Sequence, residues 1–129
     1  MHDYHATVFQ DGTATFMARI VDFYGAPIKQ SDVDSITYSV YLLNEGKPES
    51  RTVNPFHSNY ELNVSDVLFD QLQTNPHWTE DDIGYNFCWT LLGSRRPSPF
   101  ELAGRHYLVE IKLVAKRIPF LVRYRLFVL

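Results

Sequence analysis

Cysteine is nearly absent from this sequence, and long apolar runs are missing altogether. A single cysteine in 129 residues excludes an intrachain disulfide. Without a run of about 18 apolar residues, no segment could cross a bilayer as a helix. The first residues also lack the basic stretch and apolar core of a secretory signal. We therefore expect a cytoplasmic protein with no membrane partner.

Apolar and aromatic side chains, in contrast, are abundant. Hydrophobic residues make up 45% of the chain, aromatic residues 15% and charged residues 21%. Disordered chains contain few aromatic residues, so these proportions indicate a folded protein. A chain of this length buries roughly two thirds of the surface of its unfolded form, which is enough for a single core. We expect one domain over residues 1–129.

Alternation of apolar and polar side chains predicts most of the secondary structure. A period of two is typical of a strand with one buried face. The last third of the chain shows it most clearly and predicts a hairpin of two long strands. The predicted strands lie within residues 12–22, 35–43, 85–92 and 107–128, with weaker edge strands at 51–53 and 60–64.

One short helix is predicted near residues 65–73, where the alternation breaks. Ser65 can cap the free amides of a first turn, and Leu68 and Leu72 stand one helical turn apart. The helix should end before Pro76, since proline disfavours helical geometry in the residue before it. About seven strands and one helix predict an all-β fold in which two sheets pack face to face.

The order of these features resembles an immunoglobulin-like antiparallel β-sandwich. A strand, the turn Asp22-Phe23-Tyr24-Gly25-Ala26-Pro27, a second strand, edge elements and a short helix precede the terminal hairpin. The spacing of Asp82, Gly84 and Cys88 resembles the corner before the second cysteine of antibody-type domains. Asn86 stands where those domains have a tyrosine, and no partner cysteine exists. We therefore interpret Cys88 as a small buried apolar residue.

A sandwich of this size is also similar in kind to small virion proteins of tailed bacteriophages, which serve as neck, tail or capsid-decoration pieces. This resemblance implies a structural protein whose partners are other copies of itself or other proteins of an assembly. It also implies location in a virion after assembly. Because fold alone does not give function, a function can be assigned only from the chemistry of particular residues.

Motifs for catalysis are missing from the sequence. It contains no Gly-x-Ser-x-Gly, no phosphate-binding loop, no His-Glu-x-x-His and no Cys-x-x-Cys. Cys88 could act as a nucleophile beside His57, His77 or His106, but alternation places it within an apolar strand. The three histidines adjoin loops and are expected in exposed or hydrogen-bonding roles. We expect no enzyme, no catalytic residue and no cofactor.

Metal ligands are equally sparse. His2 and His5 belong to a terminus expected to be loose, where no fold holds further ligands in place. Two groups of carboxylates could supply oxygen ligands for calcium, namely residues 80–82 and the pair Asp32 and Asp34. The same residues could equally form a solvated loop and a turn. We expect no metal site.

Charge is divided unevenly along the chain. Residues 1–94 contain four basic and thirteen acidic side chains, a balance of −9, whereas residues 95–129 contain eight basic and two acidic ones, a balance of +6. Three interpretations stay open. The charges pair across neighbouring strands, or the basic region meets an acidic face of a partner protein, or it contacts nucleic acid. The net charge of −3 disfavours the last, because phosphates repel an acidic protein.

These observations favour a non-enzymatic structural or interaction module of a larger assembly. The four apolar residues 126–129 indicate either a last strand covered on both faces or one covered by a partner. The alternative is a carbohydrate-binding module that uses Trp78 and loop tyrosines, with calcium at Asp81 and Asp82. The residues expected to contact a partner are Arg95, Arg96, Lys116, Arg117, Arg123, Arg125 and Trp78.

Overall fold

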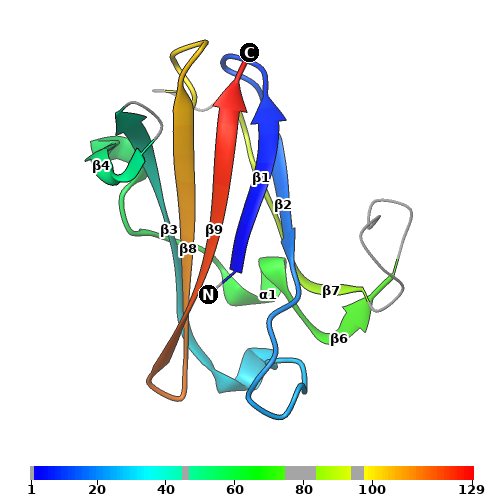
Figure 1. Cartoon of the computed structure of the whole chain (residues 1–129). Helices are drawn as coiled ribbons and strands as arrows, with labels where there is room; N and C mark the ends of the chain where they lie inside the picture. Colours follow the sequence, from blue (N-terminus) through cyan, green and yellow to red (C-terminus); the bar gives the residue numbers. More distant parts are fainter. Residues whose placement is uncertain (1, 45–46, 75–83, 94–97) are drawn as a thin grey trace.

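The computed structural model describes residues 2–44, 47–74, 84–93 and 98–129 (Figure 1). Strands dominate these residues, and the only helices among them are three single turns. The strands are β1 (His2–Val8), β2 (Ala14–Ala18), β3 (Val33–Asn44), β4 (Lys47–Val53), β5 (Tyr60–Glu61), β6 (Leu68–Gln73), β7 (Tyr85–Leu91), β8 (His106–Ala115) and β9 (Ile118–Val128). The helical turns are η1 (Gln30–Asp32), η2 (Pro55–His57) and α1 (Val64–Val67).

Two sheets pack face to face, so the predicted all-β sandwich is confirmed. The larger sheet has the order β1-β9-β8-β3-β4, with β5 also paired to β3, and the smaller has the order β2-β7-β6 (Figure 1). Apart from β1, which pairs with β9 in the larger sheet, and the two-residue β5, the strands divide between the sheets in the chain order of an immunoglobulin-like sandwich. No helix in the described parts of the chain is long and apolar enough to cross a membrane.

β1 is a strand that the sequence did not predict. The segment with His2 and His5, expected to be a loose terminus, pairs with β9 along its whole length and in parallel, unlike the other pairs of strands. The ring of Tyr4 stacks on that of Tyr124 at 5.1 Å, and Val8 is buried. β9 therefore lies between β1 and β8, inside its sheet, but its outward-facing residues are half-buried, so the strand is central without being covered on both faces.

Aromatic rings join the inner faces of the two sheets. Tyr38 of the larger sheet lies 4.4 Å from Trp89 of the smaller, centroid to centroid. Phe16 lies 5.4 Å from Trp89 and 4.7 Å from Tyr124. The surrounding core is aliphatic and, for the residues beside Tyr38 on β3 and opposite it on β8, fully buried: Ile36, Val40, Val109, Ile111 and Leu113. This contact between sheets explains the alternation of apolar and polar residues from Ile36 to Val40 on β3 and from Val109 to Leu113 on β8.

The predicted helix exists but is only one turn long. It covers Val64–Val67, and the chain then extends as β6, which pairs with β7. Asn63, rather than Ser65, is the capping residue, because its side-chain oxygen accepts a hydrogen bond from the Ser65 amide at 3.2 Å. Leu68 is fully buried opposite Phe87, and the register of β6 against β7 shifts between Leu68 and Gln73.

The corner expected before Cys88 lies elsewhere. β7, which contains Cys88, is the middle strand of the smaller sheet. It is Tyr107, at the start of β8, whose hydroxyl accepts a hydrogen bond from the Leu102 amide at 3.0 Å. This is the arrangement of a tyrosine corner. In immunoglobulin-like domains a tyrosine near the start of the sixth of seven strands, which corresponds to β8 here, forms a hydrogen bond with the backbone a few residues upstream. Val109 occupies the buried position two residues later, so a valine stands where antibody-type domains have the second cysteine.

Asn86 is a buried polar residue that ties β7 to the chain beyond β2. Its side-chain oxygen accepts a hydrogen bond from the Ile20 amide at 2.7 Å, and its side-chain nitrogen donates to the Ile20 carbonyl, also at 2.7 Å. The same nitrogen lies 3.5 Å from the carbonyl oxygen of Ile28. Since the Ile28 amide in turn donates to the Ile20 carbonyl at 3.1 Å, Asn86 holds both ends of segment 20–28.

Replacement of Asn86 by alanine should therefore destabilise the protein far more than loss of an exposed asparagine. Asn86→Ala leaves the Ile20 amide without its partner and the Ile20 carbonyl with the Ile28 amide alone, at a cost of about 3 kcal/mol in the free energy of unfolding. Asn63→Ala is the matched control and should cost about 1 kcal/mol, as the loss of a helix cap. Urea denaturation of both variants measures the difference, and equal costs would contradict the clamping role of Asn86.

Candidate functional site

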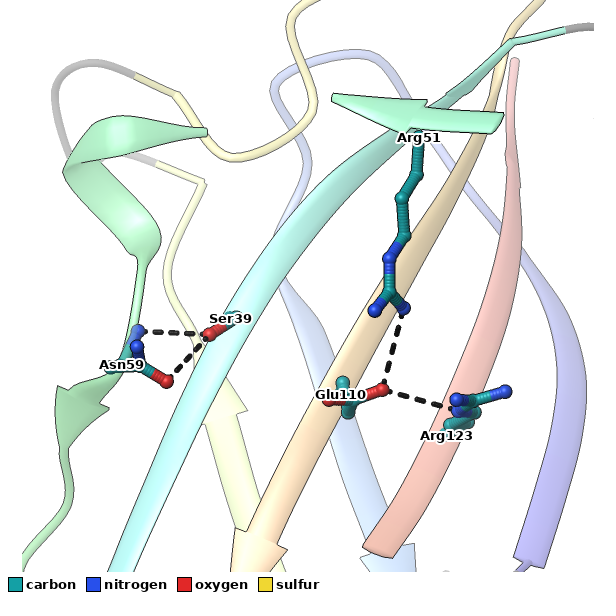
Figure 2. Close-up of polar contacts among 5 residues, drawn as sticks. All are labelled: Ser39, Arg51, Asn59, Glu110 and Arg123. Atoms are coloured by element: carbon teal, nitrogen blue, oxygen red, sulfur yellow. Dashed lines mark hydrogen bonds and ion pairs between the residues drawn. The ribbon is translucent and has the colours of Figure 1, made fainter. Parts of the chain in front are cut away.

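The outer face of the larger sheet contains a charged cluster built on Glu110. One carboxylate oxygen of Glu110 accepts a hydrogen bond from Nε of Arg123 at 3.1 Å and lies 3.5 Å from Nη1 of Arg51 (Figure 2). Arg123 is directly opposite Glu110 in the register of β8 and β9. The guanidinium of Arg51 also lies over the ring of Tyr41, 4.2 Å from its centroid. One carboxylate thus partly neutralises two arginines from different strands.

Ser39 continues this polar row towards the edge of the sheet. Its hydroxyl oxygen accepts a hydrogen bond from the Asn59 amide at 2.8 Å (Figure 2). Asn59 has a φ of 49°, a conformation that asparagine tolerates better than most residues. The contact joins the segment between η2 and β5 to β3, and so has a structural role.

The β8–β9 turn places Lys116 and Arg117 beside two aspartates. Both residues of this two-residue turn have positive φ, 48° and 66°, as a type I′ turn requires. Asp34 accepts a hydrogen bond from the Arg117 amide at 3.0 Å, and Asp32 lies 3.6 Å from the Lys116 ammonium. Asp32 and Asp34 thus support a strained turn, and the Lys116 pair is exposed enough to add little stability.

The other predicted contact residues are divided between the sheet and the undescribed segments. Arg125 lies half-buried on β9, opposite His5 and Leu108. Arg95, Arg96 and Trp78 lie outside the described residues, as do the acidic residues 80–82. Of the four predicted residues that the structure describes, Arg123 and Arg125 lie on β9, and Lys116 and Arg117 form the turn before it. Two of their side chains, those of Arg123 and Lys116, make ion pairs within the chain.

Of the histidines considered for catalysis, His77 lies outside the described residues, and the ring of His106 packs against Phe127 at 4.9 Å. His57 is buried, with 1% of its surface exposed, and its Nδ1 lies 2.7 Å from the Tyr38 hydroxyl. Cys88 is half-buried rather than buried as expected, and this partial burial raises the pKa of its thiol, which disfavours the reactive thiolate. Burial likewise raises the pKa of Tyr107. Among the described residues no group of three histidine, cysteine or carboxylate side chains could hold a metal ion.

The turn between β2 and η1 carries the most exposed aromatic side chains of the described residues. Phe23 is 96% and Tyr24 90% exposed, and their rings meet edge to face at 5.5 Å. We refer to these two residues as the aromatic tip. Leaving one such side chain in water rather than burying it forgoes roughly 2 to 3 kcal/mol. A pair of exposed rings at one turn therefore marks a surface that favours an apolar partner.

Hydrogen bonds make the turn beneath the aromatic tip rigid. The Asp22 carboxylate accepts from the amides of Tyr24 at 2.9 Å and Ala26 at 3.0 Å. The Asp22 carbonyl accepts from the Gly25 amide at 3.0 Å, and the Asp22 amide donates to the Ala26 carbonyl at 2.9 Å. Gly25 has a φ of 83°, which closes the three-residue loop as a type I turn with a bulge. Val21 and Pro27 then pair at the base.

A groove of about 430 Å³ runs between β1 and β2, where the edges of the two sheets meet. Among the described strands, β1 pairs only with β9 and β2 only with β7, so the groove follows two sheet edges. None of the described residues that line it is charged. They are Tyr4, Ala6, Thr7, Val8, Phe9, Gly12, Thr13, Ala14, Thr15, Phe16, Tyr124 and Leu126.

A second, smaller hollow of about 260 Å³ lies at the start of β8. Tyr107, Leu42 and Pro99 contribute to its walls, and Glu101 is the one charged residue among its described lining. The hydroxyl of Tyr107 is already used in the hydrogen bond from Leu102. The hollow therefore presents few polar groups with which a ligand could be recognised.

Sequence reasoning treated segment 22–27 only as a turn and so missed the aromatic tip. The available signal was that Phe23 and Tyr24 follow an aspartate and precede a glycine, so that no strand alternation could bury them. The groove had no such signal, because β1 was not predicted. Comparison of the chain with family models, curated proteins and solved structures finds no match.

Removal of the Glu110 carboxylate should leave two arginines without their shared acceptor. Because the Glu110 side chain is only 16% exposed, Glu110→Ala should cost about 1 to 2 kcal/mol in the free energy of unfolding. The cost should shrink in about 1 M NaCl, where ion pairs are screened. Glu101→Ala, at an exposed glutamate, is the control and should cost less than about 0.5 kcal/mol. Urea denaturation at both salt concentrations checks this, and equal costs for the two variants would show that the cluster adds nothing.

Proposed function

We propose that this chain is a non-enzymatic docking module of a larger assembly and that the aromatic tip is its anchor in a partner protein. The observation that carries the proposal is the exposure of Phe23 and Tyr24 on a turn closed by hydrogen bonds. Aromatic side chains dominate binding energy where they enter a pocket of the partner. Because the turn is already ordered, docking loses little conformational entropy.

The charges of the larger sheet fit a secondary role in this function. Arg123 and Lys116 already pair with Glu110 and Asp32 within the chain. Such charges steer the approach of a partner and select against wrong partners more than they anchor it. We propose the partners to be other copies of this chain or other structural proteins, in an assembly such as the virion of a tailed bacteriophage.

The carbohydrate-binding alternative receives no support from the aromatic tip. A sugar ring stacks on a flat aromatic face, whereas the rings of Phe23 and Tyr24 meet at 89° and form no common platform. The residues on which the alternative depends, Trp78, Asp81 and Asp82, lie outside the described part of the chain. A pair of perpendicular rings instead has the shape of a knob, which fits a concave protein pocket.

A photo-crosslinking side chain at position 23 tests the proposal directly. Benzoyl-phenylalanine is a close substitute for Phe23, and at 96% exposure the change cannot disturb the core. In the organism that makes the protein, light should produce a discrete covalent adduct to another protein chain. The matched control carries the same side chain at Phe69, an aromatic residue of β6 that is 37% exposed.

The comparison between the two positions decides the outcome. An adduct at position 23 that is absent at position 69 supports docking through the aromatic tip. Equal labelling at both positions, or no protein adduct at position 23, would rule out the tip as the anchor. Mass spectrometry of the adduct identifies the chain that is bound.

A further inference from the structure

The aromatic tip and the groove between β1 and β2 have matching chemistry. Neither contains a charged side chain among the described residues. The exposed ring of Phe9 and the half-buried ring of Tyr4 give the groove apolar surface, and the buried Phe16, Tyr124 and Leu126 lie beneath it. Thr7, an exposed residue of β1, contributes a hydroxyl that a tyrosine hydroxyl could bond. The groove therefore suits an uncharged aromatic group with one polar end.

Resting on the proposed function, we propose that the partner is a second copy of this chain, whose aromatic tip occupies the β1–β2 groove. The volume of about 430 Å³ falls within the range of roughly 300 to 1,000 Å³ of sites that enclose a ligand of several rings. It therefore has room for both Phe23 and Tyr24. Charge matching argues for this occupant, because a charged segment would lose its hydration in the groove without gaining a partner.

The two surfaces lie at opposite ends of the sandwich. β2 begins at Ala14, which lines the groove, and leads at its other end to the turn that carries the tip. In Figure 1 the β1–β2 turn lies at the top beside the C-terminus, and segment 19–29 lies at the bottom. One copy can therefore present its tip to the groove of a second and its groove to the tip of a third. Such head-to-tail contacts build rings or filaments.

The contact between tip and groove is weak by itself. A buried phenylalanine or tyrosine contributes roughly 150 to 250 Å², whereas each partner in a stable interface buries about 800 Å². Two rings supply about half of that area. The association should therefore be reversible and visible only at high protein concentration, with ring closure or a surrounding assembly needed to make it permanent.

Analytical ultracentrifugation of three variants tests the inference. The tip variant is Phe23→Ser/Tyr24→Ser, and the groove variant is Ala6→Glu, which places a charge at an exposed residue of the groove lining. The control is Phe69→Ser, which removes an exposed ring elsewhere. The average mass of the wild type and of the control should rise with concentration up to the solubility limit. The tip and groove variants should each stay monomeric.

Mixing the two defective variants distinguishes a contact between tip and groove from a contact between two tips or two grooves. The tip variant keeps an intact groove and the groove variant keeps an intact tip, so an equimolar mixture should form one-to-one dimers that do not grow further. Circular dichroism of each variant must match that of the wild type, which ensures that loss of association does not reflect unfolding. Failure of the mixture to form dimers would overturn the inference.

Other outcomes separate this inference from the proposed function. A wild type that stays monomeric at every concentration overturns self-association. If position 23 nevertheless forms an adduct with a different protein, the docking function stands and only the second copy is excluded. A photo-crosslinker at Ala6 that labels a different protein would likewise assign the groove to a segment of that protein.

Discussion

The side-chain amide of Asn86 is the interaction on which the position of the candidate site depends. It pairs with both backbone groups of Ile20, at 2.7 Å each, and its nitrogen approaches the carbonyl of Ile28. The Asn86 side chain thus continues the hydrogen bonding between β2 and β7 beyond the last paired residue of β2, Ala18. Because Asn86 is fully buried, these bonds are shielded from water. The segment between Ile20 and Ile28 is fixed at its base and projects the aromatic tip.

The strands could be predicted wherever one face is buried and the other is exposed to solvent. This holds for β3, β8 and β9, whose alternation is explained by the ring contact of Tyr38 with Trp89 and its aliphatic surroundings. This pattern was not applied to β1, although Tyr4, Ala6 and Val8 alternate there with Asp3, His5 and Thr7, because the first residues were expected to form a loose terminus. It fails at Leu68, because a four-residue spacing is compatible with both a helix and a strand and only the pairing with β7 decides between them.

The candidate site was harder to predict than the fold, because its parts are defined by contacts distant in sequence. The charge asymmetry correctly indicated basic side chains on the terminal hairpin. However, the pairing of Arg123 with Glu110 depends on the register of β8 and β9. The pairing of Lys116 with Asp32 depends on contact between the β8–β9 turn and η1. The sequence around the aromatic tip shows a turn that cannot bury Phe23 and Tyr24, but the support that Asn86 gives to this turn depends on a contact distant in sequence. A buried asparagine cannot be distinguished from an exposed one by sequence pattern alone.

The proposed function requires an aromatic tip that is ordered before any partner binds. Hydrogen bonds from Asn86 fix the base of the tip. ¹⁵N relaxation of the free protein measures this order most directly. The account predicts backbone order parameters of about 0.85 from Asp22 to Ala26, as in rigid strands. It also predicts a fall at these residues alone when Asn86 is replaced. Order parameters below about 0.6 across the turn in the unmodified protein would contradict it.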